Sequence, residues 1–467
     1  MRIEADSIGT MEVPVKAYYG VQTLRAKHNF NITGRPLHPV FITNLARIKK
    51  AAAMTNMAAN VLDEKIGKAI LQACDEIIAG KLLNQFIVDA IQGGAGTSAN
   101  MNANEVIANR AIEILGGEKG DYSIVHPNDH VNMAQSTNDV IPSAGKLTIR
   151  ELLPSLVKEL KRLHKALNEK AVEFDDVVKI GRTQLQDAVP IRLGQSFEAY
   201  AAVVERDIHR LEDLDEDLRM LNIGATAVGT AINVNPVYLF HIIKNVNLVC
   251  GTNCYQAEDL FDATQNLDGF VHISSALKTC AVSLSKICND LRLLSSGPKT
   301  GLGEINLPPK QNGSSIMPGK INPVIPEVVS QVAYNVIGND VTVTLAAEAG
   351  QLELNAFEPV IFYNIFESID TLRGAVQTLT DNCVLGITAN RDRCEQLVES
   401  SVAIATALCP YIGYKKSADI AKQSLESGVS VRDLVLQQQL MTPQQLEQCM
   451  NLKALTLPGH MAEYRKM

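Results

Sequence analysis

The segment LLPSLVKELKRLHKAL, Leu152–Leu167, decides the fold class of this chain. Its apolar side chains recur at steps of three and four residues, the period of one face of an α-helix. Similar spacing runs from Phe197 to Leu221 over about seven turns. Leu267–Leu294 is apolar on several faces, and Pro326–Leu345, although rich in Val, carries its proline only in the first turn. The pattern predicts a bundle of long helices.

Shorter elements flank this bundle. We expect a mainly α subunit with three domains: a mostly helical N-terminal domain at residues 1–139, the long-helix bundle at 140–394 and a small helical C-terminal domain at 395–467. A helix that is apolar nearly all round needs partners on every side. Helices of several subunits are therefore expected to pack together.

The composition excludes several classes of partner. The chain has 467 residues, 46% of them hydrophobic and 20% charged, with a net charge of -8. This balance predicts neither a nucleic-acid nor an anionic-membrane partner. Neither a signal-peptide core nor a run of about 18 uncharged apolar residues occurs, which predicts a soluble, cytoplasmic protein. The nine scattered cysteines predict free core thiols.

The loop GSSIMPGKINP, Gly313–Pro323, is the most informative stretch for function. It carries two hydroxyls (Ser314 and Ser315), then the amine of Lys320 and the amide of Asn322. A Gly/Ser/Pro loop with a potential base beside a cation suits a site that closes over a small anionic substrate.

Three other segments collect hydroxyls, amides and glycines where a core would hold Leu. They are GGAGTSANMNANEVIANR (Gly93–Arg110), VHPNDHVNMAQSTNDV (Val125–Val140) and GRTQLQDAVP (Gly181–Pro190). In the second, Ser136–Asn138 places three donors where a helix could begin, which suits a bound carboxylate. Taken alone, the first segment also fits a polar turn that caps a helix, and the third a polar connection between helices.

Cofactor and metal motifs are weaker. No strand precedes the glycines of Gly93–Arg110, and no acidic ribose partner follows, which argues against a dinucleotide site. His126 and His130 form an HxxxH pattern without a third ligand, so turn or surface histidines are favoured over a metal pair. Cys250 and Cys254 likewise lack a second pair.

Together these segments resemble the aspartase/fumarase superfamily, in the same order and over essentially the whole chain. YYGVQTLRA (Tyr18–Ala26) and GEINLPPKQNGSSIMPGK (Gly303–Lys320) resemble the ammonia-lyase branch more than the fumarases. Fumarases typically show a Trp-Gly-Ala-Gln opening, and a Thr-His pair where this chain has Thr183–Gln184. The histidine discriminates weakly, because some ammonia-lyases also carry it.

The resemblance implies reversible elimination of ammonia from L-aspartate to give fumarate, with Ser314 as the base that removes the Cβ proton. It implies a homotetramer with sites shared between subunits and no required cofactor, and it leaves divalent-cation activation open. The substrate-binding residues that it implies are Thr97, Ser136, Thr137, Asn138, Thr183, Gln184, Ser315, Lys320 and Asn322. Gln184 occupies the position of the fumarase histidine, so the resemblance implies that it lines the site but does not assign its role.

The chemistry explains why such residues are needed. Removing a proton beside a carboxylate leaves an aci-carboxylate with two negative charges, which preorganised donors must stabilise. A serine can act as the base only where a cation and N–H dipoles favour its alkoxide. Fumarate hydration, or a lyase reaction on a substituted aspartate, are the alternative activities. A structural role, as in superfamily members of the lens, is the alternative outside catalysis.

Overall fold

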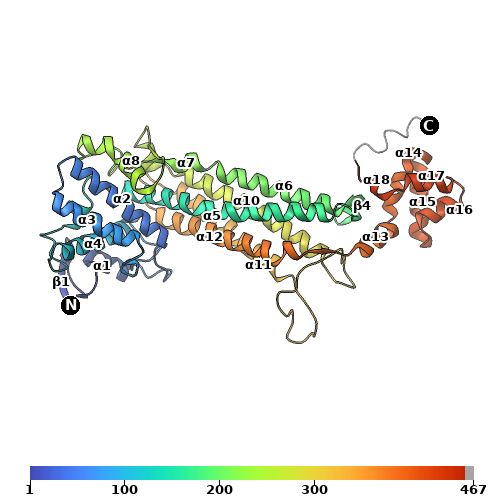
Figure 1. Ribbon diagram of the computed structural model, residues 1–467, viewed down its shortest axis with the longest axis horizontal. Coiled ribbons are helices and arrows are strands. Elements are labelled where there is room, and N and C mark those ends of the chain that lie inside the picture. The colour runs from blue at the N-terminus through green and yellow to red at the C-terminus, as the bar shows by residue number, and fades with distance from the viewer. Residues whose placement is uncertain (458–467) are drawn as a thin grey trace. The chain divides into compact units, whose positions relative to one another are not determined.

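Long helices dominate the structure, a computed structural model that describes residues 1–457 (Figure 1). The longest helices are α5 (Thr137–Glu173), α6 (Leu193–Glu212), α10 (Asp268–Leu294), α11 (Val324–Glu348) and α12 (Glu358–Asn382). They include the segments in which apolar periodicity predicted long helices, so the mainly α fold class is confirmed. Among the described residues, no helix is long and apolar enough to cross a lipid bilayer.

The chain forms two compact units, and the first consists of residues 1–157, 209–281 and 334–372. Its core lies where α2 packs against α3, α4 and α8. Ala51–Ala53 of α2 are buried, and such small side chains let neighbouring helices approach closely. The shorter elements of this unit are β1 (Arg2–Asp6), β2 (Gly9–Val13), α1 (Val21–Asn29), α2 (Pro39–Ala58), α3 (Glu64–Ile78), η1 (Leu83–Gln85), α4 (Thr97–Ile114), η2 (Pro127–Val131), α7 (Asp215–Arg219), β5 (Met220–Leu221), α8 (Pro236–Cys250), β6 (Tyr255–Gln256) and α9 (Asp262–Gln265).

The second unit consists of residues 158–208, 282–333 and 373–467. In it the antiparallel hairpin β3–β4 packs against α13, and the C-terminal helices enclose a separate apolar core that includes Leu408, Ile420 and Val435. The shorter elements of this unit are β3 (Val178–Thr183), β4 (Gln186–Arg192), β7 (Ile305–Asn306), η3 (Val384–Gly386), β8 (Thr388–Ala389), α13 (Arg391–Ser400), η4 (Val402–Leu408), α14 (Cys409–Ile412), α15 (Tyr414–Ser427), α16 (Val431–Gln437), α17 (Pro443–Cys449) and α18 (Leu452–Leu455).

The division into three domains at residues 139/140 and 394/395 stays a prediction. Residues 458–467, at the end of the third predicted domain, lie outside the described residues.

The helix predicted from Phe197 to Leu221 is shorter than its spacing indicates. α6 ends at Glu212, α7 covers only Asp215–Arg219, and Leu221 belongs to the two-residue strand β5. Five acidic residues crowd residues 212–217. Negative charges repel one another there and oppose the negative end of the helix dipole, which favours a break.

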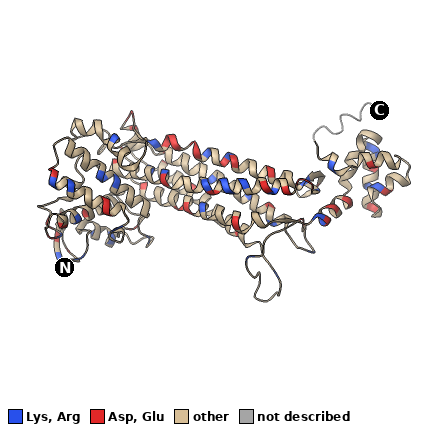
Figure 2. Cartoon of the chain, viewed as in Figure 1, with Lys and Arg blue, Asp and Glu red and all other residues tan. Residues whose placement is uncertain are grey.

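The distribution of charged residues and the state of the cysteines agree with the expectations from the composition. Basic and acidic residues are interspersed along the long helices (Figure 2). All nine cysteines are free, and seven of them are buried, as predicted for core thiols. Burial raises the pKa of the Cys250 thiol to about 12, which keeps it protonated at neutral pH.

Candidate active site

The first candidate segment is a tight turn that begins α4. Gly94, Ala95 and Gly96 all have left-handed backbones, with φ of 85°, 56° and 88°. A Cβ at Gly96 would also lie 3.0 Å from the Ile141 side chain, so conformation and space both favour glycine. Thr97 follows as the first helical residue, and its N–H and hydroxyl both donate to the Gly94 carbonyl, at 2.9 and 2.7 Å. The turn thus holds the exposed Thr97 side chain at the N-terminus of α4.

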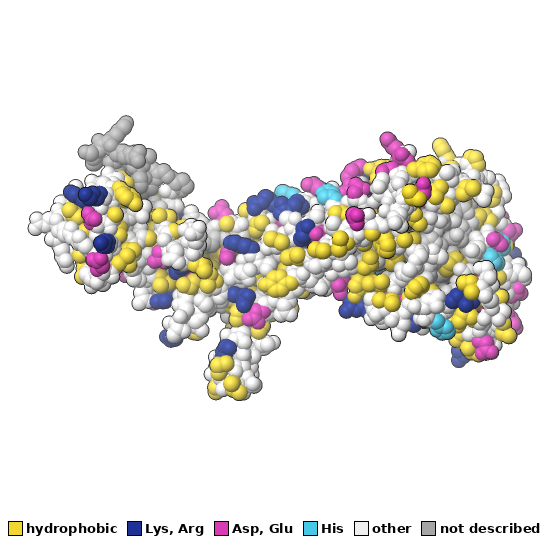
Figure 3. Space-filling view, turned by 180° about the vertical axis from the view of Figure 1, so that it is seen from behind, with side chains coloured by type: hydrophobic (Ala, Val, Ile, Leu, Met, Phe, Trp, Pro, Cys, Tyr) yellow, Lys and Arg dark blue, Asp and Glu magenta, His cyan; other side chains and the backbone are white. Residues whose placement is uncertain are grey.

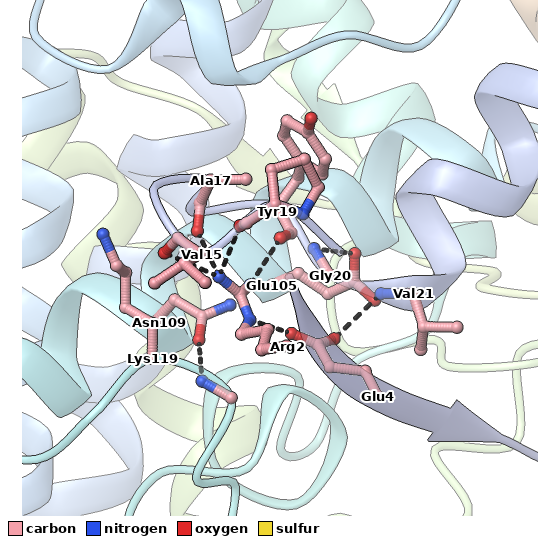
Figure 4. A network of polar contacts seen from close by, with 12 residues as sticks. Arg2, Glu4, Val15, Ala17, Tyr19, Gly20, Val21, Glu105, Asn109 and Lys119 are labelled. Carbon is pink, nitrogen blue, oxygen red and sulfur yellow. Dashed lines mark hydrogen bonds and ion pairs between the residues drawn. The ribbon is translucent and has the colours of Figure 1, made fainter. Parts of the chain in front are cut away.

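Buried polar residues of α4 hold the N-terminal part of the chain. The Glu105 carboxylate accepts hydrogen bonds from the Gly20 N–H at 2.8 Å and the Thr23 hydroxyl at 2.5 Å. Glu4 accepts from the Val21 N–H at 2.9 Å, and Figure 4 shows both carboxylates at this turn. Burial raises the pKa of Glu105, while these hydrogen bonds favour its ionised form. Glu105, the last residue of the TSANMNANE segment, therefore has a structural role.

His126 and His130 cap turns. His126 Nδ1 accepts from the N–H groups of Asn128 and Asp129, at 3.2 and 3.1 Å, and His130 Nδ1 accepts from the His126 N–H at 2.8 Å. This confirms the interpretation of both as turn histidines. Across residues 1–457, no three or more His, Cys, Asp or Glu side chains are grouped so that they could hold a metal ion.

The second candidate segment starts α5 at Thr137, as its sequence predicted. Ser136 Oγ accepts from the Asn138 N–H at 3.2 Å, and Asp139 Oδ1 accepts from the Ser136 N–H at 2.9 Å. The two bonds are reciprocal, as in a capping box. Asn138 Nδ2 also donates to the Ala227 carbonyl at 2.7 Å, which fastens the helix start to the segment before α8.

Two buried ionisable groups support this helix start. Asp139 Oδ2 accepts from the N–H groups of Gly224 and Thr226, at 3.0 and 3.2 Å. Burial raises the pKa of Asp139 to about 6, although these donors and the charge of Lys49 favour its ionised form. Burial also lowers the pKa of Lys49 to about 7. Because Asp139 is buried, its hydrogen bonds fix the position of Ser136–Asn138 from within the core.

The N-termini of α4 and α5 lie side by side. Asn100 Nδ2 of α4 donates to Thr137 Oγ1 of α5 at 3.4 Å, and Gly96 lies against Ile141. Helix N-termini carry partial positive charge and unpaired N–H groups. The structure thus brings Thr97 and Ser136–Asn138 together around two positive helix ends, an arrangement that suits a carboxylate.

The third candidate segment is a hairpin, which the sequence did not predict. Thr183 pairs with Gln186, so Gln184 and Leu185 form its two-residue turn, with φ of 54° and 62°. Such a turn needs left-handed residues, normally Asn or Gly, so Gln and Leu are strained there. Thr183 and Gln184 are both exposed at the tip.

The base of this hairpin rests on a buried carboxylate. Glu304 is fully buried and lies 2.9 Å from Arg182 and 3.3 Å from Lys179, both of β3. Burial lowers the pKa of Lys179, while the charge of Glu304 opposes that effect. A rigid base therefore carries a strained, exposed tip.

The fourth candidate segment is a loop between α10 and α11, which Figure 1 shows leaving the long helices. Its neck is closed by the Gly313 N–H, which donates to the Lys320 carbonyl at 2.8 Å, and by Asn322 Nδ2, which donates to the Gly313 carbonyl at 2.8 Å. A Cβ at Gly313 would lie 2.6 Å from the Lys320 carbonyl oxygen, so only glycine fits. Ser314 Oγ accepts from the N–H groups of Ile316 and Met317, at 3.2 and 3.0 Å.

The ten predicted site residues fall into two groups. Thr97 and Ser136–Asn138 belong to the first unit, whereas Thr183, Gln184, Ser314, Ser315, Lys320 and Asn322 belong to the second. Ser315 and Lys320 are exposed, and Ser314 and Asn322 are half-buried. Their roles in binding and catalysis stay predictions.

An apolar cavity of about 240 Å³ backs the first group. Its wall is mainly apolar and includes Phe41, Phe362 and Phe366. The lining also contains one guanidinium and two carboxylates, those of Arg35, Glu367 and Asp370. Such a wall does not suit a dicarboxylate, so the polar starts of the two helices, and not this cavity, are the candidate site.

Comparisons with known proteins show the family to which the chain belongs. A family model described as "Lyase" matches residues 9–338, and a model described as "Fumarase C C-terminus" matches residues 404–457. The chain therefore belongs to the aspartase/fumarase superfamily, as the motifs predicted. It is 52% identical to aspartate ammonia-lyase from Bacillus subtilis, over 98% of this chain and 96% of that protein. It is 56% identical to the Helicobacter pylori enzyme of the same name, over 96% of each.

Solved structures share the fold. A structure described as fumarate lyase:delta crystallin from Brucella melitensis bound to cobalt has a TM-score of 0.95 and 50% identity, over 98% of this chain and 100% of that one. A class II fumarase from Schistosoma mansoni has a TM-score of 0.93 but only 33% identity, over 98% and 99%. The fold is thus common to both, and the sequence lies further from that fumarase.

Sequence reasoning missed the residues that hold the site from within. Asn100, Asn132 and Asp139 are structural neighbours of the predicted site residues, and none was singled out as a candidate. The signal was present in NMNANE, Asn100–Glu105, where amides and a carboxylate occupy positions that helical spacing assigns to the core.

Proposed function

We propose that this chain is an aspartate ammonia-lyase, a carbon–nitrogen lyase that reversibly converts L-aspartate to fumarate and ammonia. The observation that carries the proposal is the 52–56% identity, over nearly the whole chain, to enzymes of that name. The motifs agree, since Thr183 is followed by Gln184 rather than by the histidine typical of fumarases.

Ser314 is the proposed base. Its alkoxide takes a proton from Cβ of aspartate, the electron pair moves into the adjacent carboxylate, and the resulting aci-carboxylate then expels the amino group as ammonia. Two N–H groups already point at Ser314 Oγ, and N–H donors to an oxyanion lower the pKa of its parent hydroxyl. Lys320, six residues on, supplies the cation that favours the same anion.

The substrate carboxylates are the proposed ligands of the remaining residues. Thr97 and Ser136–Asn138 offer hydroxyls, an amide and two helix N-termini to one complete site. Thr183, Gln184, Ser315, Lys320 and Asn322 complete it. Because a charged intermediate needs donors fixed in advance, the turns that hold these side chains contribute directly to rate.

The proposed site residues lie far apart along the chain, which also supports a homotetramer with sites shared between subunits. The exposed side chains of Val328, Tyr334, Val341 and Leu345 recur along α11, while Val329 and Val336 of the same helix are buried. A second apolar face on a long helix calls for a partner helix. Figure 3 shows apolar side chains along the surface of the long helices, as an assembly through these helices requires.

The proposed enzyme is cytoplasmic, needs no cofactor for the elimination and binds neither nucleic acid nor membrane. Activation by a divalent cation is a separate question, answered by assaying with and without a chelator.

A paired assay tests the function. Ultraviolet absorbance follows fumarate when the protein is mixed with L-aspartate or with L-malate. Fumarate from aspartate, with far slower release from malate, is expected. The reverse preference would assign fumarate hydratase, the second candidate, whose fold the chain also shares. An N-substituted aspartate in a third arm tests the remaining alternative.

A further inference from the structure

A single buried amide connects the starts of α4 and α5. Asn100 is 2% exposed, and its Nδ2 donates both to Asn132 Oδ1 at 3.1 Å and to Thr137 Oγ1 at 3.4 Å. An amide nitrogen carries two hydrogens, so it can serve both acceptors at once. Asn100 thus reaches a proposed substrate-binding hydroxyl from the protein interior.

Asn132 holds this amide in place. Its Oδ1 accepts three hydrogen bonds, from Lys49 Nζ at 2.8 Å, Asn100 Nδ2 at 3.1 Å and Asn104 Nδ2 at 3.2 Å. Its own Nδ2 donates to the Gln135 carbonyl at 3.1 Å, immediately before Ser136. Helices α2 and α4 are therefore tied through one side chain to the turn that precedes α5.

The hydrogen bond to Thr137 has a chemical consequence. A hydroxyl has one hydrogen and two lone pairs, and it rotates to suit its partners. When the Asn100 amide donates to Oγ1, the hydroxyl hydrogen must point away from that amide. The Thr137 side chain is half-buried, so the hydroxyl hydrogen that points away from Asn100 can reach solvent or, in the proposed site, a substrate carboxylate.

We propose that Asn100 is a positioning residue, which orients the Thr137 hydroxyl so that it donates its hydrogen to a substrate carboxylate. The proposal rests on the proposed function and adds to it a residue that does not touch the substrate. Without Asn100, the hydroxyl can turn its hydrogen inward and present a lone pair to the anion, which weakens binding.

The chain supplies a matched control. Asn104 lies one helical turn further along α4, is fully buried and also donates to Asn132 Oδ1, but its amide also lies 3.4 Å from Met101 Sδ, whereas that of Asn100 reaches Thr137. Asn100→Leu and Asn104→Leu each remove a donor to Asn132. A merely structural role predicts similar losses in both, whereas positioning of Thr137 predicts a loss specific to Asn100.

The experiment measures kcat and KM for L-aspartate in the assembled enzyme. Asn100→Leu is expected to lower kcat/KM about tenfold, mainly through KM, as for one lost hydrogen bond, and Asn104→Leu to change it much less. In a Thr137→Val background, which lacks the hydroxyl, Asn100→Leu should cause little further loss, because the two residues act through one interaction.

Three results would overturn the proposal: equal losses in the two Asn variants, an unchanged KM in Asn100→Leu, or full additivity with Thr137→Val. If Asn100→Leu does not assemble, as judged by sedimentation, Asn100→Ala and Asn104→Ala repeat the comparison. Wild-type enzyme that releases no fumarate from aspartate would instead refute the proposed function, so the two failures are distinguishable.

Discussion

Ser314 Oγ accepts a hydrogen bond from the Met317 N–H at 3.0 Å, within the loop that also carries Lys320. A second N–H, that of Ile316, points at the same oxygen. The loop therefore prepares a serine oxygen for negative charge through its own backbone. These donors support the proposal that Ser314 is the base, because N–H groups stabilise an alkoxide that serine, at its ordinary acidity, does not form at neutral pH.

Replacing Ser314 by Ala is expected to lower kcat by at least about 10²–10⁴, because the base is lost. The half-buried loop hydroxyl contributes little to stability, so the variant should still assemble. Fumarate release and sedimentation check the two expectations. Ser315→Ala is the neighbouring control, in which KM should rise more than kcat falls. Near-wild-type turnover by an assembled Ser314→Ala protein would rule out the assigned base.

Replacing Lys320 by Met is expected to raise KM for aspartate and to lower kcat as well. The cation is proposed both to hold a substrate carboxylate and to favour the Ser314 alkoxide, so binding and chemistry should suffer together. Steady-state kinetics separate the two effects. A change in KM alone would mean that the cation acts only in ground-state binding.

Replacing Gln184–Leu185 by Asn-Gly is expected to stabilise the β3–β4 turn by about 1 kcal/mol or more, since those residues suit its left-handed backbone. The thermal midpoint of unfolding should rise, while KM for aspartate should also rise because the Gln184 side chain is lost. Gln186→Asn, one position beyond the turn, is the control. A higher midpoint with unchanged KM would remove Gln184 from the site.

The buried carboxyl of Asp139 predicts a specific pH dependence. Burial raises its pKa to about 6, from 3.8. Between these values the folded protein keeps a proton that the unfolded chain releases. The contribution of Asp139 to the free energy of unfolding is therefore complete below about pH 4 and is lost as pH rises through 6. The loss amounts to roughly 3 kcal/mol. Asp139→Asn cannot titrate. The thermal midpoint of Asp139→Asn should therefore rise relative to that of the wild type between pH 4 and 7. A difference in midpoint that stays constant over this range would contradict the raised pKa of Asp139.

Mixing Thr183→Ala and Ser314→Ala proteins after dissociation should restore part of the activity. If each site draws these residues from different subunits, some sites in hybrid tetramers contain neither mutation. Activity of the reassembled mixture, with hybrids verified by mass, is the measurement. An active monomer, or verified hybrids without activity, would contradict shared sites.

The sequence predicted the long helices where apolar spacing was unbroken, as in α10 and α11. It failed after Glu212, because hydrophobic spacing continued while clustered acidic charges ended the helix. It also missed the hairpin at Gln184, since left-handed Gln and Leu carry no turn signal of their own. Hydrophobic spacing indicates local preferences only. The end of α6 depends on electrostatic repulsion, and the hairpin turn contains a strained backbone.

The candidate site residues are those that the resemblance marked, and their roles stay predictions, whereas the buried residues that position them were found only from tertiary contacts. Asn100 and Asn132 look like ordinary polar residues until α2, α4 and the turn before α5 are brought together. In the proposed tetramer, Thr183 and Ser314 meet in one site through contacts between chains, and no local sequence pattern encodes such contacts.

The most direct test of the central claim is the reverse reaction in D₂O. Fumarate and ammonium are incubated with wild-type protein and with Ser314→Ala, and the products are analysed by NMR. With Ser314 as the base, the wild type is expected to form L-aspartate carrying one deuterium at Cβ, and Ser314→Ala essentially none. Deuterated malate as the main product, or equal formation of deuterated aspartate by Ser314→Ala, would contradict this expectation.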